Sequence, residues 1–241
     1  MISASKRNKY ILILSVVLNV LTVCFFVGKR IYYGYQGYRQ NHRQISADSL
    51  KKRQAGYDAY TMNMISIFKA MPIDSNGIVF LGTSLTQWFP VQEAFKDATI
   101  QNRGIAANTT ANILNRLGDI IESKPRKIFI EGGANDVTKI PTDSIYNNLT
   151  KIFGMIKSGT PATKIYYQSV LPFGDRNTRS IEELNNKVEI YCKANDIVFI
   201  NLYPDFLRGT AMKKELTIDG THLTGKGYSL WANDIRKYVI D

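Results

Sequence analysis

The sequence predicts an α/β protein: a three-layer α/β/α sandwich around a five-stranded parallel sheet, preceded by an N-terminal transmembrane helix. Two observations lead to this prediction. From residue 77 onward, five short apolar runs alternate with amphipathic stretches, which is typical of parallel strands covered by helices on both faces. Before them, residues 10–28 contain no charged side chain. A chain of 241 residues is long enough for one domain with a sizeable core.

The segment YILILSVVLNVLTVCFFVG, residues 10–28, is long enough to span a membrane. At a rise of ~1.5 Å per residue, its helix nearly covers a ~30 Å hydrocarbon core. The alternatives are a cleaved signal peptide, for which the apolar region is long, and a lipoprotein signal at Cys24, for which Val23 is too bulky. We therefore expect an uncleaved signal anchor, with residues 1–9 in the cytoplasm and the domain that follows outside it, in the periplasm or at the cell surface.

The distribution of charge argues against a nucleic-acid partner. The formal net charge is +11, but the first 71 residues carry eleven of the 31 Lys and Arg and only two of the 20 Asp and Glu. Residues 72–241 are therefore nearly neutral. A basic excess confined to the flanks of an apolar span indicates contact with a membrane surface rather than with nucleic acid.

The remaining elements follow in chain order. Residues 29–71 predict a juxtamembrane linker and then, from Ser46 to about Met71, a helix that leads into the domain at residues 72–241. The predicted strands cover residues 77–82, 99–104, 127–133, 164–171 and 197–202. Helical patterns separate them, as in residues 109–124. Because ligands bind outside the carboxyl ends of parallel strands, chemistry is expected where these strands end.

Three polar motifs follow three successive strands, and a fourth lies just before the last helical pattern. GTSLT places Ser84 in the turn after the first strand, and NRGIAANTT leaves the Gly104 N–H without side-chain cover. EGGAND places Asn135 after the third strand, and TIDGTH places Asp219 three residues before His222. Each motif alone has an ordinary explanation: a helix cap, a turn glycine or a surface histidine. Together they supply a nucleophile, a base, a carboxylate partner for the base, and oxyanion donors at one sheet edge.

These motifs resemble the SGNH hydrolases, also called GDSL-type esterases and lipases. The blocks LGTSLTQW, NRGIAANTT, GGAND and DGTH occur in the family's order, and the resemblance covers roughly residues 77–241. It implies a flavodoxin-like SGNH hydrolase fold. It also implies a catalytic triad and an oxyanion hole, formed respectively by Ser84, Asp219 and His222 and by Ser84, Gly104 and Asn135.

One position departs from the family pattern. Thr83 replaces the acidic residue that usually precedes the serine, a change expected to affect the polarity of the pocket. The surrounding sequence is most similar to the branch that contains sialate O-acetylesterases, rhamnogalacturonan acetylesterases and acetylhydrolases of the platelet-activating-factor type.

The activity implied by the resemblance is hydrolysis of carboxylic esters through an acyl-enzyme, without a metal or organic cofactor. The expected substrates carry short acyl groups, such as O-acetyl, on carbohydrate or lipid. Trp88 and Phe89 are candidates for the wall of the acyl pocket, with core packing as the alternative. Arg176 or Arg179 is a candidate for contact with an acidic substrate group, with a solvated loop as the alternative.

Other functions were weighed against hydrolysis. The same triad can transfer acyl groups to envelope glycans if a membrane partner supplies the donor. A noncatalytic membrane-tethered binding module has no chemical reason to retain the complete triad and oxyanion donors. A nucleotide-binding flavodoxin-like domain is a further alternative, but this sequence lacks the glycine-rich motif that such a domain uses to bind phosphate. Cys24 and Cys192 have neither disulfide nor metal-ligand spacing, and Cys192 is predicted to pack as an apolar residue on a helix.

Overall fold

The computed structural model describes most of the domain and a few residues before it. The described residues are 25, 28–30, 32–33, 49, 51–173 and 178–241. The predicted cytoplasmic tail, nearly all of the predicted anchor and most of the linker lie outside them. Within the described ranges, no helix is long and apolar enough to cross a membrane. The chain divides into two compact units, Met1–Tyr60 and Thr61–Asp241, and the second contains the α/β domain.

A parallel five-stranded sheet forms the centre of the second unit, in the order β2-β1-β3-β4-β5. The strands are β1 (Ile78–Gly82), β2 (Ile100–Gly104), β3 (Lys127–Glu131), β4 (Lys164–Gln168) and β5 (Val198–Ile200). The five predicted strands are confirmed, although the last three end two or three residues earlier than expected. This strand order reverses its winding between β1 and β3, and doubly wound folds bind their ligands at such a switch point.

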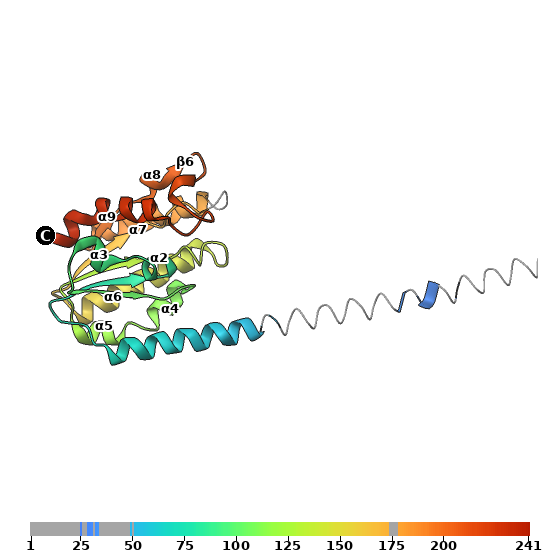
Figure 1. Cartoon of the computed structure of the whole chain (residues 1–241), viewed down its shortest axis with the longest axis horizontal. Coiled ribbons are helices and arrows are strands. Elements are labelled where there is room, and N and C mark those ends of the chain that lie inside the picture. Colours follow the sequence, from blue (N-terminus) through green and yellow to red (C-terminus); the bar gives the residue numbers. More distant parts are fainter. Residues whose placement is uncertain (1–24, 26–27, 31, 34–48, 50, 174–177) are drawn as a thin grey trace, which may run out of the picture. The chain divides into compact units, whose positions relative to one another are not determined.

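Helices cover both faces of the sheet (Figure 1). In chain order they are α2 (Ser84–Gln87), α3 (Val91–Phe95), α4 (Thr110–Leu114), α5 (Gly118–Ser123), α6 (Thr142–Gly159), α7 (Thr178–Ala194), α8 (Tyr203–Phe206) and α9 (Gly225–Ile240). Residues 51–70 are also helical, and a two-stranded hairpin, β6 (Leu207–Arg208) and β7 (Ala211–Met212), follows α8. The helical pattern over residues 109–124 forms two short helices, α4 and α5, and between them Arg116 donates to the Gly82 carbonyl.

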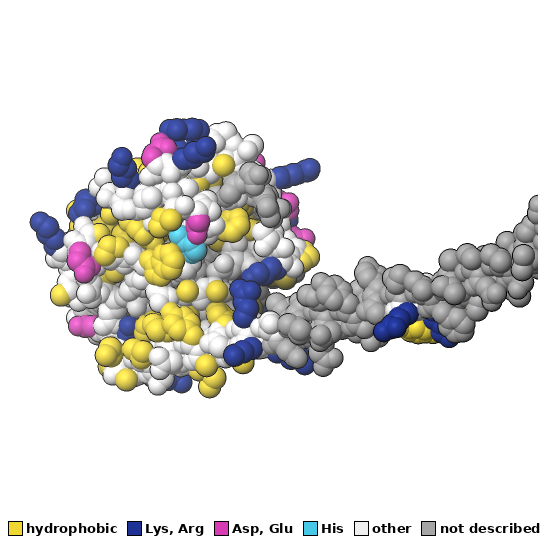
Figure 2. Space-filling model, turned by 45° about the vertical axis from the view of Figure 1, so that its right-hand side comes forward, with side chains coloured by type: hydrophobic (Ala, Val, Ile, Leu, Met, Phe, Trp, Pro, Cys, Tyr) yellow, Lys and Arg dark blue, Asp and Glu magenta, His cyan; other side chains and the backbone are white. Residues whose placement is uncertain are grey.

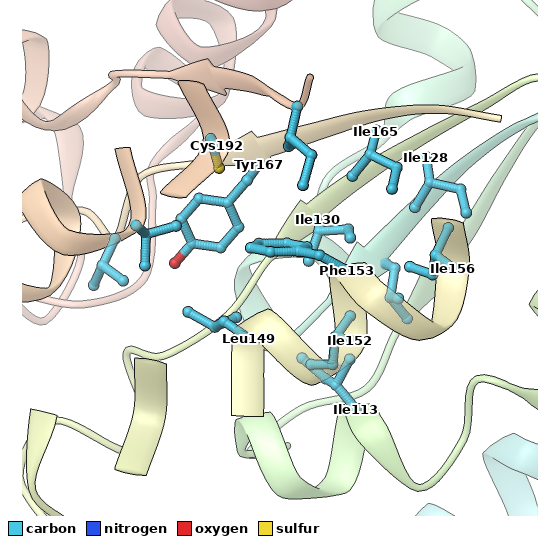
Figure 3. Close-up of a cluster of buried hydrophobic side chains, with 14 of the residues drawn as sticks. Ile113, Ile128, Ile130, Leu149, Ile152, Phe153, Ile156, Ile165, Tyr167 and Cys192 are labelled. Carbon is cyan, nitrogen blue, oxygen red and sulfur yellow. The ribbon is translucent and has the colours of Figure 1, made fainter. Parts of the chain in front are cut away.

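The alternation of side chains along the strands builds two cores. In β1, Val79 and Leu81 pack with helices α4 to α7, whereas Ile78 and Phe80 pack with α3 and α9 on the opposite face. Figure 3 shows the first core around β3, β4 and α6. Cys192 lies in it, as predicted, and burial raises the pKa of its thiol to about 12.

Candidate active site

Ser84 follows the carboxyl end of strand β1, the neighbour of the central strand β3. It is the first residue of α2, so its backbone N–H has no acceptor within that helix. The side chain is largely buried, with 8% of the residue exposed. Its Oγ lies 3.1 Å from His222 Nε2, although the two residues are 138 positions apart in the sequence. The fold therefore brings the predicted nucleophile and base within hydrogen-bond distance.

His222 is held in the loop before α9 by its own local sequence. The ring Nδ1 lies 2.7 Å from Asp219 Oδ2, and the His222 and Thr221 N–H groups donate to Asp219 Oδ1. The hydrogen bond from the His222 ring, followed by that from its backbone, lowers the pKa of Asp219 to about 2. An ionised carboxylate accepts the Nδ1–H, which leaves Nε2 as an acceptor facing Ser84.

Trp88 and Phe89, the two aromatic residues that follow the serine, lie in different environments. The Trp88 ring lies 4.4 Å from the His222 ring, centroid to centroid, and 51% of the residue is exposed. Phe89 is buried in the core and packs against Trp231 of α9. Trp88 therefore lies beside His222, whereas Phe89 follows the alternative of core packing. Figure 2 shows hydrophobic side chains around the partly exposed histidine.

Gly104 lies beside the nucleophile turn because the β1–β2 register pairs it with Gly82. A Cβ on Gly104 would lie 2.2 Å from the Gln87 backbone nitrogen, so only glycine permits this approach to α2. The Gly104 N–H donates to Asn102 Oδ1 at 2.8 Å. The sequence interpretation treated this N–H as uncovered, and the structure corrects that: the side chain two residues earlier reaches back to it.

Asn135 is oriented by the loop that follows β2. Its Nδ2 donates to the Asn108 carbonyl at 3.0 Å, which uses one of the two amide N–H bonds. The second N–H can serve another acceptor. The neighbouring Asp136 is 1% exposed and accepts the N–H and the hydroxyl of Thr110, the first residue of α4. The Asn–Asp pair therefore ties the end of β3 to the loop after β2.

Comparison with known proteins agrees with this geometry. Residues 80–230 match the GDSL-like Lipase/Acylhydrolase family. The chain belongs to this family. An arylesterase of Vibrio mimicus is 28% identical over 166 residues, which cover 61% of this chain and 80% of the arylesterase. The chain is thus an esterase or acylhydrolase, an enzyme that hydrolyses carboxylic esters.

Solved structures of the GDSL-like family share the fold. A GDSL-like lipase of Bacteroides thetaiotaomicron superposes with a TM-score of 0.64 at 27% identity, covering 77% of this chain and 97% of the lipase. A Streptococcus pneumonia protein described provisionally as a platelet activating factor gives a TM-score of 0.74 at 24% identity, covering 80% and 99% of the two chains. At that identity the second likeness shows the fold alone.

Thr83, the departure from the GDSL pattern, points into the protein. Thr83 is 1% exposed, and both its N–H and its hydroxyl donate to the carboxylate of Glu131 at the end of β3. Thr83 therefore does not line the opening of the pocket, contrary to the sequence expectation, because a buried acceptor holds its side chain. Arg176 lies outside the described residues, and Arg179 is exposed on the first turn of α7.

The polar contacts of two further residues at this GDSL-type site were not predicted. The buried Arg116 donates to Asn108 Oδ1 and to the Gly82 carbonyl, and the partly buried Tyr228 of α9 donates to the Leu85 carbonyl in α2. For Arg116, a charged residue within an apolar pattern is the signal in the sequence. Among the described residues, no cluster of three or more His, Cys, Asp or Glu has an arrangement that could hold a metal ion.

Proposed function

We propose that this GDSL-family enzyme is a serine esterase that uses Ser84, His222 and Asp219 as a catalytic triad. The observation that carries the proposal is the continuous chain of contacts from Ser84 Oγ to His222 Nε2 at 3.1 Å and from His222 Nδ1 to Asp219 Oδ2 at 2.7 Å. These are the contacts through which an imidazole takes a proton from a serine while a carboxylate stabilises the imidazolium.

The reaction then has two halves. Nε2 of His222 takes the Ser84 proton as Oγ forms a bond to the ester carbonyl carbon. The imidazolium returns that proton to the leaving alcohol when the ester C–O bond breaks, leaving an acyl-enzyme. Water, deprotonated by His222, attacks the acyl carbon and releases the carboxylic acid and free Ser84.

The tetrahedral oxyanion needs donors beside Ser84. We assign the Ser84 N–H, which has no intrahelical acceptor, and the second N–H of the Asn135 side chain. The Gly104 N–H completes the set by sharing its hydrogen between Asn102 Oδ1 and the oxyanion, since bifurcated hydrogen bonds are common.

The proposed substrates carry short acyl groups, such as O-acetyl, on carbohydrate or lipid. Trp88 supports this choice, because its exposed indole narrows the space beside His222. We further propose that residues 10–28 anchor the enzyme in the membrane with its domain on the extracytoplasmic side. Protease added to intact spheroplasts should then remove the domain, and complete protection would contradict this topology.

The test uses the purified full-length chain, kept in detergent, with p-nitrophenyl acetate, butyrate and octanoate. Wild type should hydrolyse acetate fastest, and Ser84→Ala should abolish the activity. Ser229→Ala, which removes an exposed hydroxyl on α9, is the matched control and should retain it. Equal rates for Ser84→Ala and wild type would refute the nucleophile. Acyl transfer to an added glycan without hydrolysis would instead favour the transferase.

A further inference from the structure

A single buried carboxylate lies directly beneath the nucleophile turn. Glu131, the last residue of β3, is 4% exposed, and its Oε2 accepts three hydrogen bonds from the turn. They come from the Thr83 N–H at 2.9 Å, the Thr83 hydroxyl at 2.9 Å and the Thr86 hydroxyl at 3.0 Å. Ser84 lies between the two threonines, so Glu131 holds the turn on both sides of the nucleophile.

The space for this carboxylate exists only because residue 82 has no side chain. A Cβ on Gly82 would lie 2.7 Å from Glu131 Oε2 and 2.1 Å from Thr86 Oγ1. The four residues Gly82, Thr83, Thr86 and Glu131 therefore fill one closed volume. Burial of a carboxylate is unfavourable unless donors satisfy it, and here the donors belong to the segment that carries the nucleophile.

The alternative is that Glu131 is an ordinary packing residue of a buried strand. Its neighbours along β3, Ile128, Phe129 and Ile130, are that kind of residue, and all are fully buried. An apolar side chain at 131 would complete the same pattern at lower cost to folding. The three hydrogen-bond donors of the nucleophile turn therefore explain why residue 131 is a carboxylate. Packing of the core does not require one.

We propose that Glu131 is a positioning residue for Ser84. From the adjacent strand β3, Glu131 supplies the carboxylate that was expected at position 83. The inference rests on the proposed function, in which Ser84 is the nucleophile. Without an acceptor, one N–H and two hydroxyls would be buried unsatisfied, and the turn would relax until they reached other partners. Ser84 Oγ would then leave the position at which it meets His222.

The experiment exchanges the two positions. Glu131→Thr removes the carboxylate from β3. Thr83→Asp in the same chain restores a carboxylate to the same buried volume, now from the nucleophile turn. Glu131→Met keeps roughly the length of the side chain, contains no oxygen acceptor, and serves if Glu131→Thr does not fold. Glu93→Gln, on the exposed surface of α3, is the control for loss of a charge. Thermal unfolding of each full-length variant is recorded beside kcat and KM for p-nitrophenyl acetate.

Glu131→Thr should lower kcat about 100-fold, the effect of a roughly 1 Å misplacement, with KM within about twofold of wild type. Adding Thr83→Asp should recover at least about tenfold of that loss. Thr83→Asp alone should also be impaired, because two carboxylates then share one buried volume. A folded Glu131→Thr or Glu131→Met enzyme with wild-type kcat overturns the proposal, as does a folded double variant without recovery.

The two proposals can fail separately. Wild type without Ser84-dependent hydrolysis is a failure of the proposed function. In that case the rate at which a fluorophosphonate probe labels Ser84, followed by mass spectrometry, still measures the reactivity of the serine without ester turnover. Slower labelling in Glu131→Thr, recovered by Thr83→Asp, supports the positioning role, and equal labelling in all variants refutes it.

Discussion

The indole of Trp88 lies against the imidazole of His222, with ring centroids 4.4 Å apart and ring planes tilted by 34°. Trp88 comes from the turn that carries Ser84, whereas His222 comes from the loop before α9, so this contact joins the two ends of the proposed triad. An aromatic face stabilises a nearby positive charge. The contact should therefore favour the imidazolium that forms when Ser84 loses its proton.

Replacing Trp88 tests this role. Trp88→Leu should lower kcat/KM about 2- to 5-fold, the value of a cation–π contact at an exposed site. Trp88→Phe retains an aromatic ring and should lie between Trp88→Leu and wild type. The measurement is kcat/KM for p-nitrophenyl acetate. A Trp88→Leu enzyme with wild-type kcat/KM would contradict this role.

Asn135 should contribute to turnover rather than to folding. Asn135→Ala removes one proposed oxyanion donor and should lower kcat by roughly 10²–10³-fold. Among the described residues, the Asn135 side chain has one hydrogen bond, to the Asn108 carbonyl, so the melting temperature should change little. Asn135→Asp is the matched variant, since it keeps the shape and loses the donors. Near-normal turnover in both variants would remove Asn135 from the oxyanion hole.

Gly104 should be required by packing as well as by chemistry. Gly104→Ala would place a methyl group 2.2 Å from the Gln87 nitrogen and 2.6 Å from its Cα, both backbone atoms that cannot move aside. Overpacking of this kind destabilises by about 1–3 kcal/mol. Gly154→Ala in α6 is the control, because its methyl group meets no atom within 4 Å. That change should stabilise the helix by roughly 0.5–1 kcal/mol. Denaturant unfolding of both variants gives the comparison, and a stable Gly104→Ala protein would contradict it.

Asp234 of α9 should make stability depend on pH. Burial, and then the charge of Asp205, raises the pKa of Asp234 to about 6, and its Oδ2 is buried without a hydrogen-bond partner among the described residues. The folded state therefore holds a proton that the unfolded state has released, and stability falls as the pH rises from about 4 to about 6. Asp234→Asn should melt above wild type at pH 7.5, with the difference disappearing near pH 4. The melting temperature of the control Glu93→Gln, relative to wild type, should not follow this pH trend. If the difference in melting temperature between Asp234→Asn and wild type were the same at every pH, titration of Asp234 would be excluded.

The sequence predicted the positions of the site residues that belong to short local motifs. Asp219 and His222 are three residues apart, and Ser84 follows an apolar strand directly, so the pattern indicates both their positions and their chemistry. Strands β1 and β3 were predictable because a buried parallel strand is often a continuous apolar run, as IVFL and IFI are. Their ends were less so, since the residues just beyond them leave the sheet to form the site.

The residues that support the site could not be predicted in this way. Glu131 meets Thr83 across 48 positions and Asp136 meets Thr110 across 26, and neither pair has a local sequence signature. Each contact exists only because parallel strands end at one edge of the sheet. The engagement of the Gly104 N–H by Asn102 was missed for a different reason: it depends on a side-chain orientation that the pattern of residue types does not encode.

The closed volume shared by Gly82, Thr83, Thr86 and Glu131 also limits the routes open to this sequence during evolution. A mutation that adds a carboxylate at position 83 brings two negative charges together, and one that removes Glu131 leaves three buried donors without an acceptor. Either of these two single steps should therefore lead to an impaired intermediate. These four positions should be inherited as one unit, and lineages that place the acid before the serine can be reached from this one only by paired substitutions.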